Sequence, residues 1–265
     1  MEEKDRKMKI VVYEEPSIVF CQPIQNLWHL PAIGLKKELQ EEGFEVLGEY
    51  ETQPKEEDFA IYMDTLLRPK HPMLHKKSLY ISLEPPVVNP RFYEKIKGWP
   101  YNRILTFSRK HCHGDGIQWL PYPCVRYDEK VLLERDSERL CGISSNITKF
   151  HGRPGELYSV RRALYLSLGN KCDLYGKDWD KDREITASVN YKGICDSNYE
   201  TFSKYKYAIS IENMFLEGYA SEKYFTPIQA GCELIRIGWN PDYGLSHCDQ
   251  DNWGKLIKKH IMDLI

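Results

Sequence analysis

The segment from Tyr205 to Gly238 constrains the fold of this chain more than any other. It opens with Tyr207-Ala-Ile-Ser-Ile, a short apolar run typical of a buried strand. A polar loop follows, and Ser221 then occupies a position suited to a helix N-cap. A second apolar run begins at Cys232. The order strand, loop, helix and strand is typical of an α/β fold with a parallel sheet.

The start of the helix in this segment is suited to an anion. N–H groups in the first turn of a helix lack partners and carry the positive end of its dipole, so they attract phosphate. Lys223 lies in this turn, although a lysine stabilises a helix better at its other end. A phosphate between lysine and helix would explain the placement. A solvated surface lysine is the alternative.

The polar residues of the loop are separated by fixed gaps, and they are Glu212, Asn213, Tyr219, Ser221, Glu222 and Lys223. Their pattern resembles the signature of glycosyltransferase family 10, the α-1,3/4-fucosyltransferases. In that family Phe-Glu-Asn ends a strand, and Tyr-x-Thr-Glu-Lys opens a helix at the same spacing. Ile211 replaces the usual Phe and Ser221 the usual Thr, which are mild departures. Ala230-Gly231 also resembles the family's continuation.

Composition is compatible with a globular enzyme. The chain has 265 residues, of which 42% are hydrophobic, enough for one large domain or two modest ones. A net charge of -2 gives no basic surface that would indicate a nucleic-acid partner. No 18-residue apolar window and no signal-peptide core occur. We expect a cytoplasmic protein, either a bacterial or viral family member or a chain trimmed to its catalytic part. Its oligomeric state stays open.

The eight cysteines form no CxxC pair, which favours free thiols in a reducing compartment. His111-Cys112-His113 suggests a metal site. However, alternate residues of an extended segment point to opposite faces, and no second ligand pair follows at zinc spacing. A surface loop is therefore the favoured interpretation. The sequence also lacks an obvious Asp-x-Asp motif, which suits enzymes that need no bound metal. We expect no essential metal and no cofactor.

Apolar and helical segments alternate along the whole chain, which predicts an α/β fold with parallel sheets. The strands expected in the first half are Lys9–Tyr13, Phe44–Leu47, Phe59–Met63, Leu79–Leu83, Ile104–Phe107 and Ile117–Leu120, with helices at Leu30–Glu42 and after Pro90. Before the signature segment, the second half predicts strands at Cys141–Ser144 and Cys172–Tyr175, and helices at Glu156–Leu168 and Tyr199–Lys204.

The Pro121-Tyr122-Pro123 turn and the charged, helix-like run Asp128–Arg139 mark the boundary between the halves. We expect an acceptor-binding domain over residues 1–127, a donor-binding domain over residues 128–250, and a C-terminal helix over residues 251–265 that packs back on the body. Two Rossmann-like domains facing across a cleft form the GT-B architecture, which the family resemblance also implies. Open sheets of this kind bind ligands at the carboxyl ends of their strands.

The resemblance extends over residues 141–176. Ser145-Asn146, an arginine on a helix, and Asp173-Leu-Tyr-Gly176 follow the family's order. Family members carry an arginine seven residues before the last apolar residue of this helix, and Arg161 has that position relative to Leu168. A guanidinium binds phosphate oxygens in a bidentate manner and stays charged. The alternative for Arg161 is an ordinary surface arginine.

The resemblance implies a nucleotide-sugar donor, GDP-fucose, and a glycan acceptor. Arg161 and Lys223 would stabilise the leaving diphosphate, and Glu222 would accept hydrogen bonds from ribose hydroxyls. Tyr219 would lie against the nucleotide. Glu212 and Asn213 would lie near the donor sugar or the diphosphate. Ser221 and Asn146 complete the expected donor site.

Glu84 is the expected general base, because Leu83-Glu84-Pro85-Pro86 resembles an element of such families in which a glutamate ends an acceptor-domain strand. Inverting transfer needs one base to take the proton of the attacking hydroxyl. Two prolines after Glu84 make its loop rigid. Glu14 and Glu15 are competing candidates, and Phe20, Trp28, His29 and Trp119 are candidates for an aromatic sugar platform. Two rivals stay open: another nucleotide sugar, or a non-catalytic sugar-binding protein.

Overall fold

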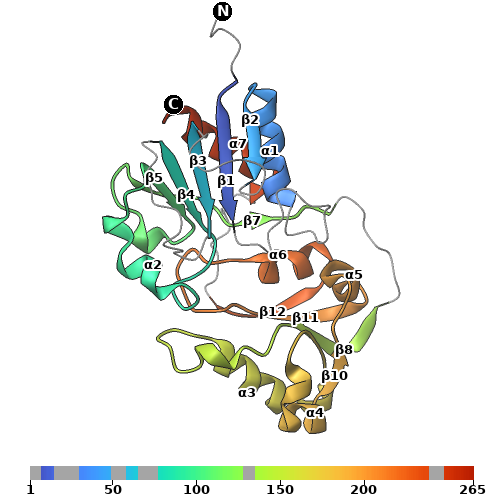
Figure 1. The fold of residues 1–265 in the computed structure, drawn as a ribbon. Helices are drawn as coiled ribbons and strands as arrows, with labels where there is room; N and C mark the ends of the chain where they lie inside the picture. The colour runs from blue at the N-terminus through green and yellow to red at the C-terminus, as the bar shows by residue number, and fades with distance from the viewer. Residues whose placement is uncertain (1–6, 15–29, 49–57, 65–76, 128–134, 239–247) are drawn as a thin grey trace, which may run out of the picture. The chain divides into compact units, whose positions relative to one another are not determined.

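The computed structural model describes residues 7–14, 30–48, 58–64, 77–127, 135–238 and 248–265. The chain divides into two compact units (Figure 1). The first unit consists of Met1–Val125 together with Ser246–Ile265, and the second unit consists of Arg126–Leu245. Each unit has its own parallel sheet. The α/β class with parallel sheets that the sequence predicts is therefore confirmed.

The first unit is built on a six-stranded parallel sheet in the order β2-β1-β3-β4-β5-β6. Its strands are β1 (Lys9–Glu14), β2 (Glu45–Gly48), β3 (Phe59–Met63), β4 (Ser78–Ser82), β5 (Arg103–Thr106) and β6 (Ile117–Trp119). Every residue of β3 and β4 is buried, as expected for central strands covered on both faces. The strand order reverses between β1 and β3, and such switch points are where open sheets bind ligands.

Helices cover both faces of this sheet. On one face α1 (Leu30–Glu41) packs against α7 (Gln250–Met262), and Leu35, Leu39, Trp253, Ile257 and Ile261 join one core cluster. On the other face α2 (Pro90–Glu94) and the 3-10 turn η2 (Ile96–Gly98) contribute Phe92, Tyr93 and Ile96. The end of the chain returns to the first unit, where β13 (Cys248–Asp249) also pairs with β7 (Pro123–Cys124).

The second unit is built on a five-stranded parallel sheet in the order β10-β9-β8-β11-β12. Its strands are β8 (Asp136–Ile143), β9 (Cys172–Tyr175), β10 (Asn190–Gly193), β11 (Tyr205–Ile211) and β12 (Glu233–Ile237). In order of sequence this is 3-2-1-4-5, the order of a Rossmann sheet. Its switch point lies between β8 and β11, the two central neighbours.

Helices also cover both faces of the second sheet. On one face α3 (Tyr158–Leu168) and α4 (Arg183–Ser188) pack Tyr165 and Ile185 against Ile209 and Ile211 of β11. On the other face α5 (Asn198–Phe202) packs near Ala208, and α6 (Glu222–Gln229) contacts α5, β11 and β12. The short 3-10 turns η4 (Thr148–Phe150), η5 (Gly169–Lys171) and η6 (Trp179–Lys181) link these elements.

Gly176, which follows β9, allows a close approach that no other residue permits. Its φ is +128°, and a Cβ built there would lie 1.9 Å from the backbone oxygen of Ser144. Ser144 follows β8, so the turn after β9 passes directly against the loop after the neighbouring strand. The glycine at the end of Asp173-Leu-Tyr-Gly176 thus has a steric reason.

One expectation about local structure is wrong. The helix-like run Asp128–Arg139 includes residues 136–139, which form the start of β8; residues 128–134 lie outside the described ranges. Glutamate and arginine favour helices, but pairing of Asp136 with Tyr205 on β11 holds this segment extended. The sequence also gave no indication of α4 or β10.

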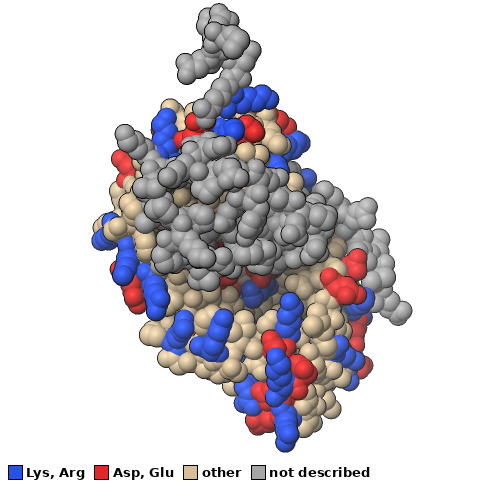
Figure 2. All heavy atoms as spheres, viewed as in Figure 1, with Lys and Arg blue, Asp and Glu red and all other residues tan. Residues whose placement is uncertain are grey.

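The described surface mixes acidic and basic side chains over much of the face shown in Figure 2. Within the described residues, no helix has the length and apolar character needed to cross a membrane. Six of the described cysteines are free thiols, namely Cys112, Cys124, Cys141, Cys172, Cys195 and Cys232. Burial raises the pKa of Cys232 to about 11, so this thiol is unreactive near neutral pH.

The two neighbouring residues Ile257 and Leu256 on α7 test whether this helix is part of the first core. Ile257 is fully buried and Leu256 is 39% exposed. We expect Ile257→Ala to lower the free energy of unfolding by about 2–5 kcal/mol. The control Leu256→Ala should lower it by less than about 1 kcal/mol. Urea denaturation measures both, and equal effects would contradict the described packing.

Candidate functional site

The loop between β11 and α6 is closed by one buried carboxylate. Glu212, the first residue after β11, is 0% exposed. Its two oxygens accept hydrogen bonds from the backbone N–H of Ser221 at 2.9 Å and from the Ser221 hydroxyl at 2.6 Å. Burial raises the pKa of Glu212, whereas the charge of Lys223 and the bonds from Ser221 oppose the rise. Glu212 therefore fixes where α6 begins.

The start of α6 holds a close ion pair. Ser221 is the N-cap, and its hydroxyl accepts a hydrogen bond from the backbone N–H of Lys223. The Lys223 ammonium lies 2.5 Å from a carboxylate oxygen of Glu222, and both side chains are about one-fifth exposed. Lys223, which the helix dipole disfavours at this position, thus has a partner within the protein. It is also open to solvent at the first turn.

Arg161 on α3 ties the two loops at the switch point together. Its side chain is 1% exposed. Nη1 donates to the backbone oxygen of Ser145, which follows β8, at 3.1 Å. Nη2 donates to the backbone oxygens of Ile211 and Glu212 at 3.1 and 3.3 Å, and to Oδ1 of Asn213 at 3.2 Å. One guanidinium therefore spans the ends of β8 and β11.

We call Arg161 with these hydrogen bonds the Arg161 clamp. Two tyrosine rings lie beside it. The Arg161 guanidinium lies 4.8 Å from the centre of the Tyr158 ring. Asn213 donates through Nδ2 to the hydroxyl of Tyr219, whose side chain is only 2% exposed. Tyr219 is thus a wall of the site rather than an exposed platform. Among the described residues, Arg161 has no carboxylate within ion-pair distance.

The adjacent Arg162 points elsewhere. Its guanidinium binds Asp182 and Glu184, each at 2.6 Å. Two consecutive residues of one helix lie about 100° apart, so a neighbour of the clamp reaches a different surface.

Arg236 on β12 is a cation of this site that the sequence analysis missed. Its side chain is 9% exposed, and Nη2 lies 4.0 Å from a carboxylate oxygen of Glu212. The guanidinium stacks on the Tyr224 ring at 4.1 Å. Burial lowers the pKa of Arg236, and Glu212 opposes this shift. An arginine inside an apolar strand next to the signature loop was the available signal.

Unsatisfied polar atoms concentrate around this loop. In the described part of the chain, eight buried side-chain nitrogen or oxygen atoms have no hydrogen-bond partner. Five of them belong to side chains of α3, β11, β12 and the start of α6, namely Nε of Arg161, Oγ of Ser210, Oε2 of Glu222, and Nε and Nη1 of Arg236. Buried polar groups are normally paired, so such a concentration calls for an explanation such as a ligand.

Asn146 is not part of this cluster. Its Nδ2 donates to the backbone oxygen of Asp178 at 3.3 Å, beyond the end of β9. It lines a separate polar cavity of about 420 Å³ together with Thr148, Asp178, Lys181, Asp182 and Arg183. The other expected donor-site residues lie together around the start of α6 and the end of β11.

Glu84 belongs to the first unit, at the carboxyl end of β4. It is half-buried, and its backbone oxygen accepts a hydrogen bond from the Tyr93 hydroxyl at 2.9 Å. Of the competing candidates, Glu14 ends β1, and Glu15 lies outside the described residues. Phe20, Trp28 and His29 also lie outside them. Trp119 is stacked against Arg109, whose guanidinium is 4.5 Å from its ring centre.

Asp64 is a second carboxyl beside Glu84, and the sequence analysis missed it. It follows β3 with a left-handed φ of +41°. Its oxygens accept from the backbone N–H groups of Leu83 at 2.8 Å and Glu84 at 3.2 Å, and from the Ser82 hydroxyl at 3.3 Å. Burial and the charge of Glu84 raise the pKa of Asp64 to about 8, although the N–H donors oppose this. Asp64 thus positions the Glu84 loop.

The solved structures that resemble this chain include two glycosyltransferases. One is the DNA-modifying enzyme β-glucosyltransferase, solved in the presence and absence of uridine diphosphoglucose. Its TM-score is 0.54 at 11% identity, over 97% of this chain and 92% of that chain. The other is an α1,3-fucosyltransferase with GDP-fucose. Its TM-score is 0.52 at 13% identity, over 100% of this chain and 83% of that chain. No family model and no curated protein matches the sequence.

These likenesses establish the fold. Both similar proteins are GT-B glycosyltransferases, and the two parallel α/β sheets of this chain agree with that two-domain, Rossmann-like class. The fold class expected from the sequence is therefore confirmed.

Arg161 and Arg162 form a matched pair for testing the clamp. Arg161→Ala leaves several backbone oxygens without their donor, so we expect the free energy of unfolding to fall by about 3–5 kcal/mol. Arg162→Ala removes partly exposed ion pairs and should cost less than about 1 kcal/mol. Chemical denaturation measures both values. Similar costs would show that the clamp does not hold the two loops.

Proposed function

We propose that this chain is an inverting glycosyltransferase of the family 10 type, which transfers L-fucose from GDP-fucose to a hydroxyl of a saccharide acceptor. The observation that carries the proposal is the β11–α6 loop. Residues of the family signature meet there at the switch point of a Rossmann sheet, together with three cations and five unpartnered buried polar atoms. A nucleoside diphosphate supplies both the negative charge and the hydrogen-bonding groups that such a site lacks.

The roles follow from what each side chain can reach. Lys223 is partly exposed at the start of α6 and would contact the diphosphate directly. Arg161 would add positive potential through its unpartnered Nε. It would also hold the loop in place through its hydrogen bonds to the backbone. The free Oε2 of Glu222 suits a ribose hydroxyl. Glu212 would act through Ser221, since both of its oxygens are bonded there.

The chemistry is a single displacement. The acceptor oxygen forms a bond to the anomeric carbon while the bond from that carbon to the diphosphate oxygen breaks. GDP leaves with the bonding electrons, and Glu84 takes the proton of the acceptor hydroxyl. Negative charge develops on the diphosphate, so cations fixed in place before the reaction lower the barrier. The developing positive charge on the sugar resembles that in glycoside hydrolysis.

A second donor has its own support. The similar β-glucosyltransferase was solved with uridine diphosphoglucose, and its TM-score is as high as that of the fucosyltransferase. The diphosphate site would serve either nucleotide. Thermal-shift titration with GDP, UDP, GDP-fucose and UDP-glucose separates these donors. Release of GDP from GDP-fucose with a panel of oligosaccharides then separates a transferase from a non-catalytic binding protein.

Lys223→Ala tests the donor site. We expect weaker GDP binding and a turnover reduced by a few hundred-fold, in line with about 3 kcal/mol for a lost charged donor. Lys206→Ala is the control, because Lys206 is an exposed lysine at the opposite end of β11. Isothermal titration with GDP and a fucose-transfer assay measure the effects. Unchanged GDP affinity in Lys223→Ala, or complete loss of wild-type activity in EDTA, would contradict the proposed donor site.

Glu84→Gln tests the base. The change keeps size and hydrogen bonding but removes the proton acceptor, so GDP-fucose should bind normally while transfer slows at least about a hundred-fold. The wild-type rate should fall at low pH as Glu84 becomes protonated, and this limb should vanish in the variant. The exposed Glu41→Gln is the control. Near-normal transfer by Glu84→Gln would place the base elsewhere, and Glu14 and Glu15 would be tested next.

A further inference from the structure

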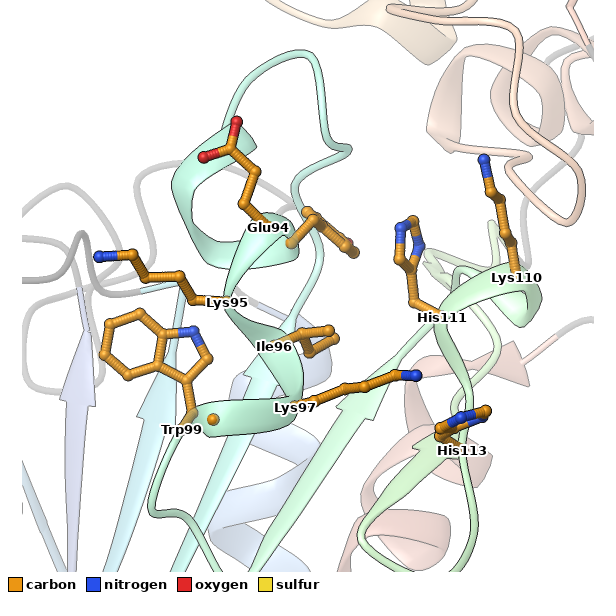
Figure 3. A pocket seen from close by; sticks show the side chains of 10 residues that line it. Glu94, Lys95, Ile96, Lys97, Trp99, Lys110, His111 and His113 are labelled. Atoms are coloured by element: carbon orange, nitrogen blue, oxygen red, sulfur yellow. The ribbon is translucent and has the colours of Figure 1, made fainter.

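The first unit contains a basic pocket that the proposed chemistry does not use. It has a volume of about 570 Å³ and lies between the α2–η2 segment and the turn η3 (Arg109–His111) (Figure 3). Its charged and titratable lining consists of Lys95, Lys97, Lys110, His111 and His113, against one carboxylate, Glu94. In a chain with a net charge of -2, such a concentration of basic groups is not a consequence of composition.

The lysines of this pocket keep their charge for a ligand. Among the described residues, none of the three lysines forms an ion pair. Figure 3 shows Lys97 extending toward the loop that carries His111 and His113, whereas Glu94 and Lys95 point away from this gap. Lys110 also lines the pocket, and its side chain extends alongside His111 rather than into this gap. Positive charge beside a hollow whose one carboxylate points outward attracts an anion.

His111 is held in place within the pocket. Its Nδ1 lies 2.7 Å from the hydroxyl of the buried Ser108, and its ring centre lies 4.6 Å from that of Tyr93. The second ring nitrogen is left for other contacts. Trp99 adds an apolar wall, fixed by a hydrogen bond from Nε1 to the backbone oxygen of Phe92. Charge beside a rigid aromatic surface suits a small polar ligand with a carbon skeleton.

Tyr93 links the pocket to the proposed base. Its ring contacts His111, and its hydroxyl donates to the backbone oxygen of Glu84 at 2.9 Å. The same hydroxyl lies 3.2 Å from the hydroxyls of Ser82 and Thr106, at the carboxyl ends of β4 and β5. Tyr93 therefore lies between the pocket and the backbone of Glu84, at the edge of the sheet where a substrate is expected.

We propose that this pocket binds an oxyanion, a phosphate, sulfate or carboxylate, carried by the acceptor saccharide. Lys97 and Lys110 supply the charge, and His111 and His113 supply directed donors. The identification of the ligand as an acceptor rests on the proposed function, whereas the anion site itself does not. Anion binding and sugar transfer are therefore tested separately.

The first test is binding of sulfate, which stays doubly charged at pH 7.5. The side-chain resonances of His111 and His113 are followed by NMR during the titration. We expect both resonances to shift, and the apparent Kd to rise at least tenfold in the double variant Lys97→Gln/Lys110→Gln. The control is Lys255→Gln/Lys259→Gln on α7, which removes the same charge away from the pocket. The two lysines of each double variant are exposed. Equal affinity in both double variants would overturn the proposal.

The second test uses lactose, lactose 6′-phosphate and 3′-sialyllactose as acceptors. We expect the anionic acceptors to have a lower KM than lactose, and this advantage to vanish in Lys97→Gln/Lys110→Gln without a change in GDP affinity. If the lower KM of the anionic acceptors persists in the variant, the pocket does not bind the anionic group of the acceptor. Transfer itself would still support the proposed function. If no donor is turned over while sulfate still binds, the proposed function fails and the anion site stands.

A nucleic-acid backbone is the alternative source of the oxyanion. Fluorescence anisotropy with a labelled duplex DNA distinguishes it. Duplex binding that is tighter than sulfate binding and is lost in Lys97→Gln/Lys110→Gln would overturn the saccharide assignment, because phosphodiesters would then occupy the pocket. Duplex binding that is absent, or equal in both double variants, supports the saccharide.

Discussion

The second unit of this protein depends on one buried guanidinium. Arg161 reaches from α3 to the ends of β8 and β11 and donates to backbone oxygens on both sides of the switch point. Desolvating a cation is costly, and in the described residues no carboxylate offsets the cost. The compensation comes from carbonyl dipoles and a tyrosine ring. Such an arrangement fixes the two loops at the switch point of the sheet.

The signature loop follows the same logic with the opposite charge. Glu212 is fully buried, and it uses both of its oxygens to hold Ser221. A carboxylate and a guanidinium thus organise the backbone from inside, while Lys223 and Glu222 remain partly exposed at the helix start. Residues of one motif therefore divide into those that shape the loop and those that can touch a ligand. Arg236, with two unpartnered nitrogens, joins the second group.

Much of this organisation could be predicted from the sequence, because short runs of apolar residues indicate buried strands. Phe59–Met63 and Cys172–Tyr175 were predicted with their observed bounds. The start of β8 was not, since its charged residues favour a helix and only pairing with β11 holds them extended. Asp64 and Arg236 were missed for a related reason. Their importance comes from contacts across strands, and no local pattern records which distant side chain lies beside them.

Asp64, beside Glu84, is a buried group that lowers the stability of the folded protein. A carboxyl whose pKa is about 8 in the folded protein and 3.8 in the unfolded chain keeps its proton only when folded, over the range between these values. The free energy of unfolding that this group contributes therefore falls as the pH rises from about 4 to about 8. In return, Asp64 is neutral near pH 7, so Glu84 has no second full charge beside it. A neutral Asp64 can hold the loop of Glu84 through its hydrogen bonds without adding negative charge to it.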